Sequence, residues 1–223
     1  MTASDSDTAP LRSKVEDALR QMIVSGLLKQ GERIKERELV DRFGISRPMI
    51  REALRRIEAE GLITLEPNRG PSVARITFEQ AEEIYEVRAS LEAQACIGFA
   101  LRASSRHVAR LREVLTALAD ATARADVAGV LSASDDFYDV ILDGSGNQIL
   151  REMLRQLQNR IVFLRRTSLS EPDRMPETLD ELTRIVEALV ARDEQAAAKA
   201  SMHHVRQASR VALRALRRHG DNG

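Results

Sequence analysis

The sequence predicts a mainly α-helical protein, in which three short helices and a β-hairpin precede an antiparallel bundle of about six helices. Two observations carry this prediction. Aromatic residues make up only 3% of the chain and tryptophan is absent, which favours helix packing over a β-sandwich. Apolar residues recur at helical spacing along most of the chain, and alternate as in strands only over residues 62–66 and 72–76.

The composition limits the classes of protein to which the chain can belong. With 223 residues and 43% hydrophobic content, it can bury one large core or two modest ones. The single cysteine, Cys96, excludes a disulfide framework and favours a reducing compartment. No apolar run approaches the ~20 residues that cross a bilayer, and the polar opening MTASDSDTAP has no signal segment. We therefore expect a cytoplasmic protein whose residues 1–10 form a disordered tail.

The formal net charge is zero, but the charges are unevenly distributed along the chain. Residues 11–76 contain 14 Lys+Arg against 10 Asp+Glu, so the rest of the chain is net negative. This asymmetry directs a search for nucleic-acid contacts to the amino-terminal third.

Residues 11–76 predict three helices that end at Gly26, Gly44 and Gly61. Their apolar faces are formed by Val15, Leu19, Met22 and Ile23, then Leu39, Val40 and Phe43, then Ile50, Leu54 and Ile57. Ser46 is a suitable N-cap for the third helix, and Pro48 falls in its first turn, where a missing N–H costs nothing. LITLE and SVARI follow as strands, joined by the turn formers of PNRGP. This order is that of a winged helix-turn-helix.

Arginines form a row on the third helix, where Arg47, Arg51 and Arg55 follow one another at i, i+4 spacing. Such a row does not neutralise itself, whereas a solvated helix face more often alternates charge at this spacing. Guanidinium groups near a helix N-terminus suit phosphates and guanine edges. An exposed Arg69 at the tip of the hairpin, beside Asn68 and Gly70, suits a minor groove or a phosphate. Incidental surface arginines are the alternative, but the adjoining turn and hairpin favour DNA contact.

The stretch ERELVDRFGISRPMIREALRRIEAEGLITLEPNRGPSVARI resembles the DNA-binding domain of GntR-type bacterial transcription regulators. The resemblance covers nearly all of residues 11–76. Carried over residue by residue, it implies the following DNA contacts: Arg37, Ser46, Arg47, Arg51, Arg69 and Gly70. Pro48 stands where the family more often has threonine, so a hydroxyl contact is lost there and half-site preference is expected to shift.

From residue 77 to 219 the pattern is purely helical, with helices expected near 78–101, 105–124, 128–143, 147–167, 176–192 and 194–218. Three segments resemble the ligand-sensing (FCD) domain of the FadR-like GntR regulators: EIYEVRASLEAQA, DDFYDVILDGSGNQIL and ARDEQAAAKASMHH. Six helices rather than seven point to the VanR-type branch. The resemblance implies a domain that binds an effector and dimerises.

Many such domains bind a divalent metal through one Asp and three His. The corresponding positions in this chain are Ser134, Tyr138, Leu182 and His204. Because leucine cannot ligate and neutral Ser and Tyr are poor ligands, we expect no metal and no other cofactor. His203 is the alternative ligand if the last helix lies one residue out of register.

A bundle without a metal can still bind an organic effector between its helices. We expect Arg88 and Arg165 to anchor a small carboxylate through bidentate hydrogen bonds, with Tyr138 and His204 adding further ones. An ion pair of Arg88 with Glu92 is an equally good reading of that arginine, and a purely structural role is the better reading of Arg165.

The sequence as a whole predicts a ligand-responsive regulator, not an enzyme, that binds double-stranded operator DNA of pseudo-palindromic sequence as a homodimer, without membrane contact. Its effector is expected to be a small organic acid. One alternative is an effector-independent regulator whose bundle only dimerises. An alternative from another class is an enzyme that uses Asp135 or Asp136 with Tyr138 and His204 as an acid/base cluster. No Gly-rich phosphate loop or nucleophile–His–Asp arrangement supports that alternative.

Overall fold

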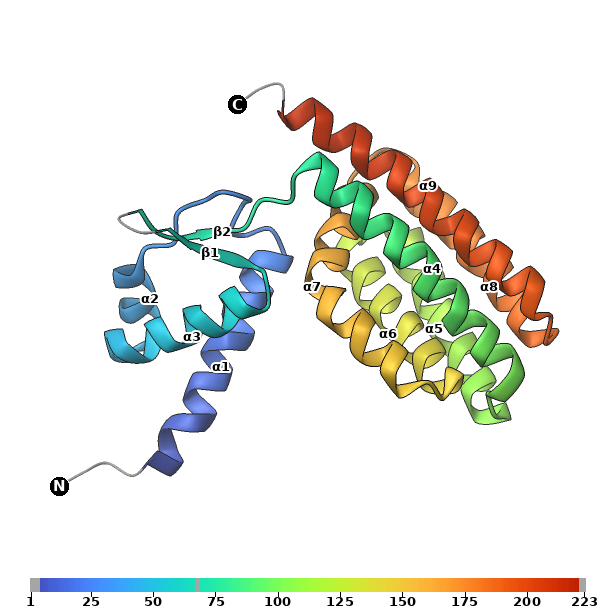
Figure 1. The fold of residues 1–223 in the computed structure, drawn as a ribbon, viewed down its shortest axis with the longest axis horizontal. Helices are drawn as coiled ribbons and strands as arrows, with labels where there is room; N and C mark the ends of the chain where they lie inside the picture. The colour runs from blue at the N-terminus through green and yellow to red at the C-terminus, as the bar shows by residue number, and fades with distance from the viewer. Residues whose placement is uncertain (1–4, 67–68, 221–223) are drawn as a thin grey trace. The chain divides into compact units, whose positions relative to one another are not determined.

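The computed structural model describes residues 5–66 and 69–220, and the chain divides into two compact units, Met1–Ile76 and Thr77–Gly223 (Figure 1). The division falls where the two sequence patterns meet. The mainly helical fold class, with a hairpin in the first unit and a bundle in the second, is confirmed. Within the described residues, we find no helix with both the length and the apolar character of a membrane span.

The first unit contains α1 (Asp5–Val24), α2 (Glu36–Phe43), α3 (Arg47–Ala59), β1 (Ile63–Glu66) and β2 (Gly70–Val73). The strands are antiparallel, with Ile63 opposite Val73. Helix α1 includes residues 5–10, which were predicted to belong to a disordered tail, so that prediction is corrected there; residues 1–4 lie outside the described residues. The reason is that polar composition alone does not distinguish a disordered tail from the first turns of a helix.

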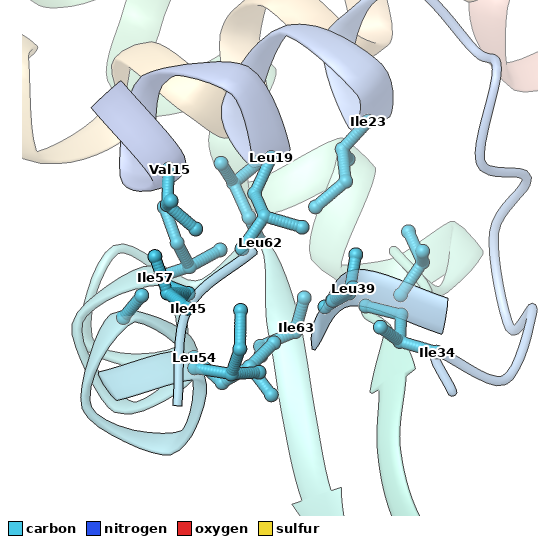
Figure 2. Close-up of a cluster of buried hydrophobic side chains, with 13 residues drawn as sticks. Val15, Leu19, Ile23, Ile34, Leu39, Ile45, Leu54, Ile57, Leu62 and Ile63 are labelled. Carbon is cyan, nitrogen blue, oxygen red and sulfur yellow. The ribbon is translucent and has the colours of Figure 1, made fainter. Parts of the chain in front are cut away.

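The core of the first unit joins one apolar face from each helix to the inner face of the hairpin (Figure 2). Buried side chains come from α1, α2, α3 and the strands: Val15, Leu19, Ile23, Leu39, Ile50, Leu54, Ile57, Ile63 and Val73. Met22, Val40 and Phe43, which the spacing also assigned to inward faces, are only partly buried. Burial of these aliphatic side chains fixes α3 against α1 and leaves the arginine-bearing face of α3 outside the core.

A short extended segment pairs with β2 on the side away from β1. Gly31 N–H donates to Val73 O (2.9 Å), and Ile34 N–H donates to Pro71 O (2.8 Å). Arg33 and Ser72 form a β-bridge within this pairing. The hairpin is thereby tied to the chain that leads into α2. The sequence prediction missed this segment because GERI shows no alternation of apolar and polar residues.

The turn between α2 and α3 depends on Gly44, which adopts a left-handed conformation (φ 65°) and donates its N–H to Val40 O at 2.9 Å. Ser46 takes the N-cap position of α3 as predicted, but its hydroxyl makes no capping hydrogen bond. Pro48 lies in the first turn, also as predicted. The hydroxyl of Ser46 is therefore exposed at the helix N-terminus rather than used by the helix.

The second unit is a bundle of six helices within the described residues: α4 (Phe78–Arg102), α5 (Ser105–Ala123), α6 (Val127–Ser145), α7 (Gln148–Leu169), α8 (Arg174–Val190) and α9 (Glu194–Gly220). The predicted helices match these within a few residues. Side chains cap the starts of five of them, because each accepts a hydrogen bond from a backbone N–H three residues on: Thr77, Ser104, Asp126, Asn147 and Asp193.

Helix α4 is central to the bundle and packs against α6 and α9 (Figure 1). Its carboxyl end is fixed by two arginines. Arg192, in the turn between α8 and α9, donates to the carbonyl oxygens of Ala100 (3.1 Å) and Ala103 (2.6 Å). Arg102 donates to the carbonyl oxygen of Ser145 at the end of α6. Cations at a helix C-terminus satisfy the free carbonyl groups and complement the helix dipole.

We predict that Gly44→Ala destabilises the first unit by about 1–2 kcal/mol, because a Cβ is unfavourable at positive φ. An added Cβ at residue 44 meets no atom within 4 Å, so the cost is conformational and not steric. Hydrogen exchange of the α2 and α3 amides in the full chain measures the effect. Gly44→Asn is the control and should cost less, because asparagine tolerates this conformation better. Equal effects of the two substitutions would contradict the explanation.

Candidate functional site

The arginines predicted to contact DNA lie on the exposed surface of α2 and α3. The Arg37 side chain is 84% exposed, with Asp41 Oδ2 at 4.0 Å as its ion-pair partner. Ser46 and Arg47 are exposed at the start of α3. Arg47 makes no hydrogen bond or ion pair with another residue of the described chain, so its guanidinium is available to an external anion.

Arg51 is exposed but not free, because its Nε donates to both carboxylate oxygens of Glu36 on α2, at 3.1 and 3.3 Å. Arg55 has a weaker partner, Glu52, at 3.8 Å. The row of arginines is thus more neutralised than its spacing suggested. The pair with Glu36 ties Arg51 on α3 to α2, the helix that also carries Arg37.

The residues at the end of α3 have structural roles. Glu60 accepts two hydrogen bonds from Arg20 of α1, at 2.9 and 2.7 Å. Glu58 accepts the backbone N–H of Leu65 at 3.0 Å. Arg56 pairs with Glu16 of α1 at 3.4 Å. These contacts hold α3 on α1 and on the hairpin, whereas the start of the helix is left for binding.

The hairpin carries a second group of basic residues. Arg69 is 83% exposed and pairs with Glu66 at 3.3 Å, while Gly70 adopts a positive φ of 77°; Asn68 lies outside the described residues. An open groove runs over the outer face of the hairpin, where the hydroxyl groups of Thr64 and Ser72 lie 3.1 Å apart. Arg33, Arg69 and Arg75 line this groove. The sequence analysis missed Arg33 and Arg75, since only the β-bridge to Ser72 brings the segment of Arg33 beside the hairpin.

In the second unit, the structure brings together the four residues predicted to bind an effector. Arg88 (α4), Tyr138 (α6), Arg165 (α7) and His204 (α9) line one cavity of about 10 Å³, which we call the polar cavity. All four are buried. Arg174 was not predicted, yet it lines the same cavity and is 1% exposed. It lies between the predicted helices 147–167 and 176–192 and belongs to neither.

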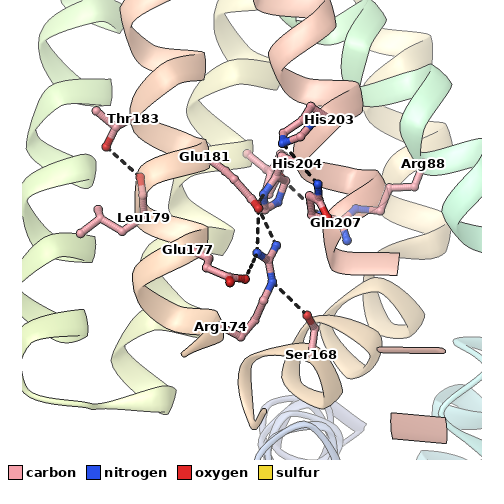
Figure 3. Close-up of polar contacts among 11 residues, drawn as sticks. Arg88, Ser168, Arg174, Glu177, Leu179, Glu181, Thr183, His203, His204 and Gln207 are labelled. Atoms are coloured by element: carbon pink, nitrogen blue, oxygen red, sulfur yellow. Dashed lines mark hydrogen bonds and ion pairs between the residues drawn. The ribbon is translucent and has the colours of Figure 1, made fainter. Parts of the chain in front are cut away.

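Arg174 is bound by acidic and hydroxyl groups (Figure 3). Its Nη1 and Nη2 donate to the two carboxylate oxygens of Glu181 at 2.8 and 2.7 Å, and its Nε lies 3.3 Å from Ser168 Oγ. His204 Nδ1 lies 2.7 Å from the same Glu181 oxygen that Nη2 contacts. Burial would raise the pKa of Glu181, but hydrogen bonds from His204 and Arg174 outweigh it and lower that pKa to about 2.

These contacts also define the hydrogen-bonding state of His204. Burial lowers the pKa of its imidazole, more than the Glu181 carboxylate raises it, so the ring is neutral at pH 7. Because the ionised Glu181 can only accept, Nδ1 carries the hydrogen and Nε2 is left as an acceptor.

Arg88 and Arg165 have their own acidic partners. Arg88 Nε donates to Glu92 Oε1 at 2.5 Å, and its Nη2 donates to the Tyr138 hydroxyl at 3.2 Å. Burial opposes the charge on Arg88, but the pair with Glu92 outweighs it and raises the pKa of the guanidinium. Arg165 pairs with Asp135 of α6. The alternative reading of Arg88 as an ion-pair partner of Glu92 is thus correct for this state of the protein.

The cavity does not fit a metal ion. Ser134, Tyr138, Leu182 and His204 do line it together, but Ser134 Oγ donates to Val130 O (2.7 Å) and Leu182 is apolar. Three guanidinium groups, of Arg88, Arg165 and Arg174, line the same space and repel a cation. Among the described residues no group of three His, Cys, Asp or Glu side chains could hold a metal. His203 is exposed on the other side of α9, so it does not replace a missing ligand.

The acid/base cluster of the enzyme alternative does not assemble either. Asp136 is exposed and lines an outer groove beside Arg106 and His107. Asp135 is engaged by Arg165 and by Gln158, whose Nε2 lies 3.2 Å from it. Neither aspartate is therefore available to Tyr138 and His204 as the carboxylate of an acid/base cluster.

Comparisons with known proteins identify both units. Residues 11–73 match the family of bacterial regulatory proteins called the gntR family, and residues 83–207 match the FCD domain. The HTH-type transcriptional regulator YdhC of Bacillus subtilis (strain 168) is 30% identical over 190 residues, which span 83% of this chain and 84% of that one. The Nta operon transcriptional regulator of Aminobacter aminovorans is 32% identical over 144 residues, covering 65% of this chain and 68% of the other.

Solved structures share the fold. McbR/YncC of E. coli has a TM-score of 0.77 at 24% identity, covering 93% of this chain and 95% of that one. A GntR transcriptional regulator of Rhodococcus sp. RHA1 has a TM-score of 0.78 at 24% identity, covering 91% and 97%. The relatives are transcription regulators, not enzymes. With a helix-turn-helix and hairpin in the first unit and an FCD bundle in the second, this chain belongs to the GntR family of DNA-binding transcription regulators.

Proposed function

We propose that this chain is a cytoplasmic, ligand-responsive regulator that binds a pseudo-palindromic operator as a homodimer and responds to a small carboxylate. The observation that carries the DNA-binding part is the exposed start of α3, with the unpaired Arg47, the uncapped Ser46 hydroxyl and Arg51 beside it. Side chains at the start of a recognition helix contact base edges in the major groove, and the basic groove of the hairpin suits backbone phosphates.

A homodimer matches the two-fold symmetry of the proposed operator, and exposed apolar side chains of the bundle support it. Val87 and Leu101 on α4, with Ile149 and Met153 on α7, are the large apolar side chains of the second unit that are most exposed among the described residues, at 45–65%. Leu101 and Ile149 lie at the same end of the bundle, where Arg102 contacts Ser145 just before α7 begins. Exposed apolar side chains gathered at one place are typical of an interface, and we assign Leu101 and Ile149 to contact with a second copy of this chain.

The polar cavity supports the effector part of the proposal. Two of its arginines carry buried nitrogens with no hydrogen-bond partner in the described chain, Nη1 of Arg88 and Nε of Arg165. Unsatisfied charged donors in a cavity favour an anionic ligand. The small size of the cavity favours the alternative, an effector-independent dimeric regulator whose bundle only dimerises. A ligand screen distinguishes the ligand-responsive regulator from the effector-independent one.

We predict that Arg51→Ala weakens affinity for the cognate operator by about 1–3 kcal/mol and relaxes base preference, because a base contact is lost. Gel shifts with the operator and with single-base variants measure this loss. Arg110→Ala is the matched control, since Arg110 is likewise exposed and paired with an acid, Glu113, but lies in the bundle. An unchanged operator affinity in the Arg51 variant would refute the recognition-helix assignment.

We predict that the double substitution Leu101→Glu and Ile149→Glu converts the dimer to monomers, since it places four charges in the proposed interface of a dimer. Sedimentation velocity across a concentration series measures the change, and operator affinity should fall with it. Leu27→Glu is the control, because Leu27 is 62% exposed and lies in the first unit. A double variant that still sediments as a dimer shows that the interface lies on another face.

We predict that at least one small organic acid stabilises the purified protein and so raises its melting temperature. The free energy of unfolding should rise by about 2.7 kcal/mol when the acid is at 100 times its Kd. Arg88→Lys should weaken that ligand at least tenfold, because it removes the bidentate geometry, while Arg110→Lys should not. Chelator should leave the melting temperature unchanged. If no acid binds, the effector-independent alternative holds; a drop in melting temperature with chelator contradicts the assignment of a metal-free cavity.

A further inference from the structure

A second small cavity lies next to the polar cavity, and the side chains of Tyr138 and Arg165 line both. Most of its other walls are aliphatic, including Ala95, Leu154 and Ile161, so we call it the apolar cavity, although Glu92 and Gln158 also line it. Each cavity measures about 10 Å³, which is room for about one water molecule. An organic acid therefore fits only if the partition between the two cavities moves.

Tyr138 and Arg165, which line both cavities, form the partition, and the Tyr138 ring lies close to two guanidinium groups. The Cζ atoms of Arg88 and Arg165 lie 5.5 and 4.8 Å from the ring centroid. The Tyr138 hydroxyl accepts one hydrogen bond, from Arg88 Nη2 at 3.2 Å. Since the same guanidinium carries the unpartnered Nη1, a carboxylate that binds Arg88 bidentately competes directly for the bond that holds Tyr138.

The buried charges favour a ligand with one negative charge. Three buried guanidinium groups surround the cavities, those of Arg88, Arg165 and Arg174. The carboxylates of Glu92 and Glu181 are buried with them, at 3% and 7% exposure. Asp135, the partner of Arg165, has a side chain that is 36% exposed. Each of the three guanidinium groups therefore has a carboxylate partner, and the buried Glu92, which lines the apolar cavity, repels a second carboxylate of a ligand.

From this geometry we propose that the effector is a monocarboxylate with a short apolar tail. Its carboxylate binds in the polar cavity, the head site, and its tail binds in the apolar cavity, the tail site. Tyr138 is the gate between the two sites. The carboxylate binds Arg88 and Arg165, the Tyr138 hydroxyl is released, and the tail enters the apolar cavity as the ring turns aside. The proposal rests on the organic-acid effector of the preceding subsection. It adds the chemical class of the ligand and the residue that admits it.

The test measures binding of straight-chain acids by calorimetry and thermal shift on the full chain. The probes are acetate, butyrate and hexanoate, with phenylacetate as an aryl tail and succinate and citrate as acids of higher charge. Affinity should rise about fourfold for each added methylene until the apolar cavity is filled, because burying one methylene contributes about 0.8 kcal/mol. Succinate and citrate should bind more weakly than hexanoate.

Substitutions in the cavity walls distinguish binding at the head site from binding at the tail site. Ala95→Val narrows the apolar cavity, so it should weaken hexanoate at least tenfold and leave acetate unchanged. Ala121→Val is the matched control, because Ala121 is also a buried helical alanine but lines neither cavity. Tyr138→Ala joins the cavities and should bind longer tails more tightly than the wild type. Each ligand shift is measured against the same variant without ligand, which removes differences in folding stability.

The results test the gate and tail site separately from the organic-acid effector. If acids bind but affinity is independent of tail length, or if succinate and citrate bind best, the gate and tail site are refuted and the organic-acid effector stands. If Ala95→Val and Ala121→Val affect hexanoate equally, the tail lies elsewhere and the gate is refuted. If no acid binds to the wild type or to Tyr138→Ala, both the effector and the gate are rejected.

Discussion

Buried ion pairs at the centre of the bundle hold its helices together. Glu181 on α8 binds Arg174 and also His204 on α9, while Arg174 reaches Ser168 on α7. The pairs of Arg88 with Tyr138 and of Arg165 with Asp135 add α4 and α6. Removing one partner of a buried pair leaves the other charge unpaired, at a cost of about 3–5 kcal/mol. The positions of five helices thus depend on charges that must remain compensated.

A network of this kind fixes which helices face one another more sharply than aliphatic packing does. Aliphatic side chains tolerate small shifts, whereas a directional hydrogen bond such as that between His204 on α9 and Glu181 on α8 loses its geometry when either helix rotates. Burial keeps His204 neutral, whereas the hydrogen bonds from His204 and Arg174 outweigh burial and keep Glu181 ionised. An anion that enters this region changes the balance of charges, so the network links ligand binding to the arrangement of helices.

Much of the fold was predictable from the sequence, because the helix ends depend on local chemistry. Gly44, Gly61 and Asn147 mark boundaries that the structure reproduces, and the apolar spacing of α3 identified Ile50, Leu54 and Ile57 as core. What was missed depends on contacts between distant segments. The pair of Arg51 with Glu36 spans 15 residues, and that of His204 with Glu181 spans 23. The spacing of residues within one helix carries no information on such partners. Polar composition similarly failed at residues 5–10, which continue α1.

The two arginines at the carboxyl end of α4 have a consequence for motion. Arg192 and Arg102 bind that end to the α8–α9 turn and to α6, so it acts as a pivot. The opposite end of α4 begins at Phe78 and is continuous with the chain that leaves β2 at Val73. A rotation of α4 about this pivot displaces the Phe78 end more than the residues near Arg88, because Phe78 lies further from the pivot. The Phe78 end is the one joined covalently to the DNA-binding unit.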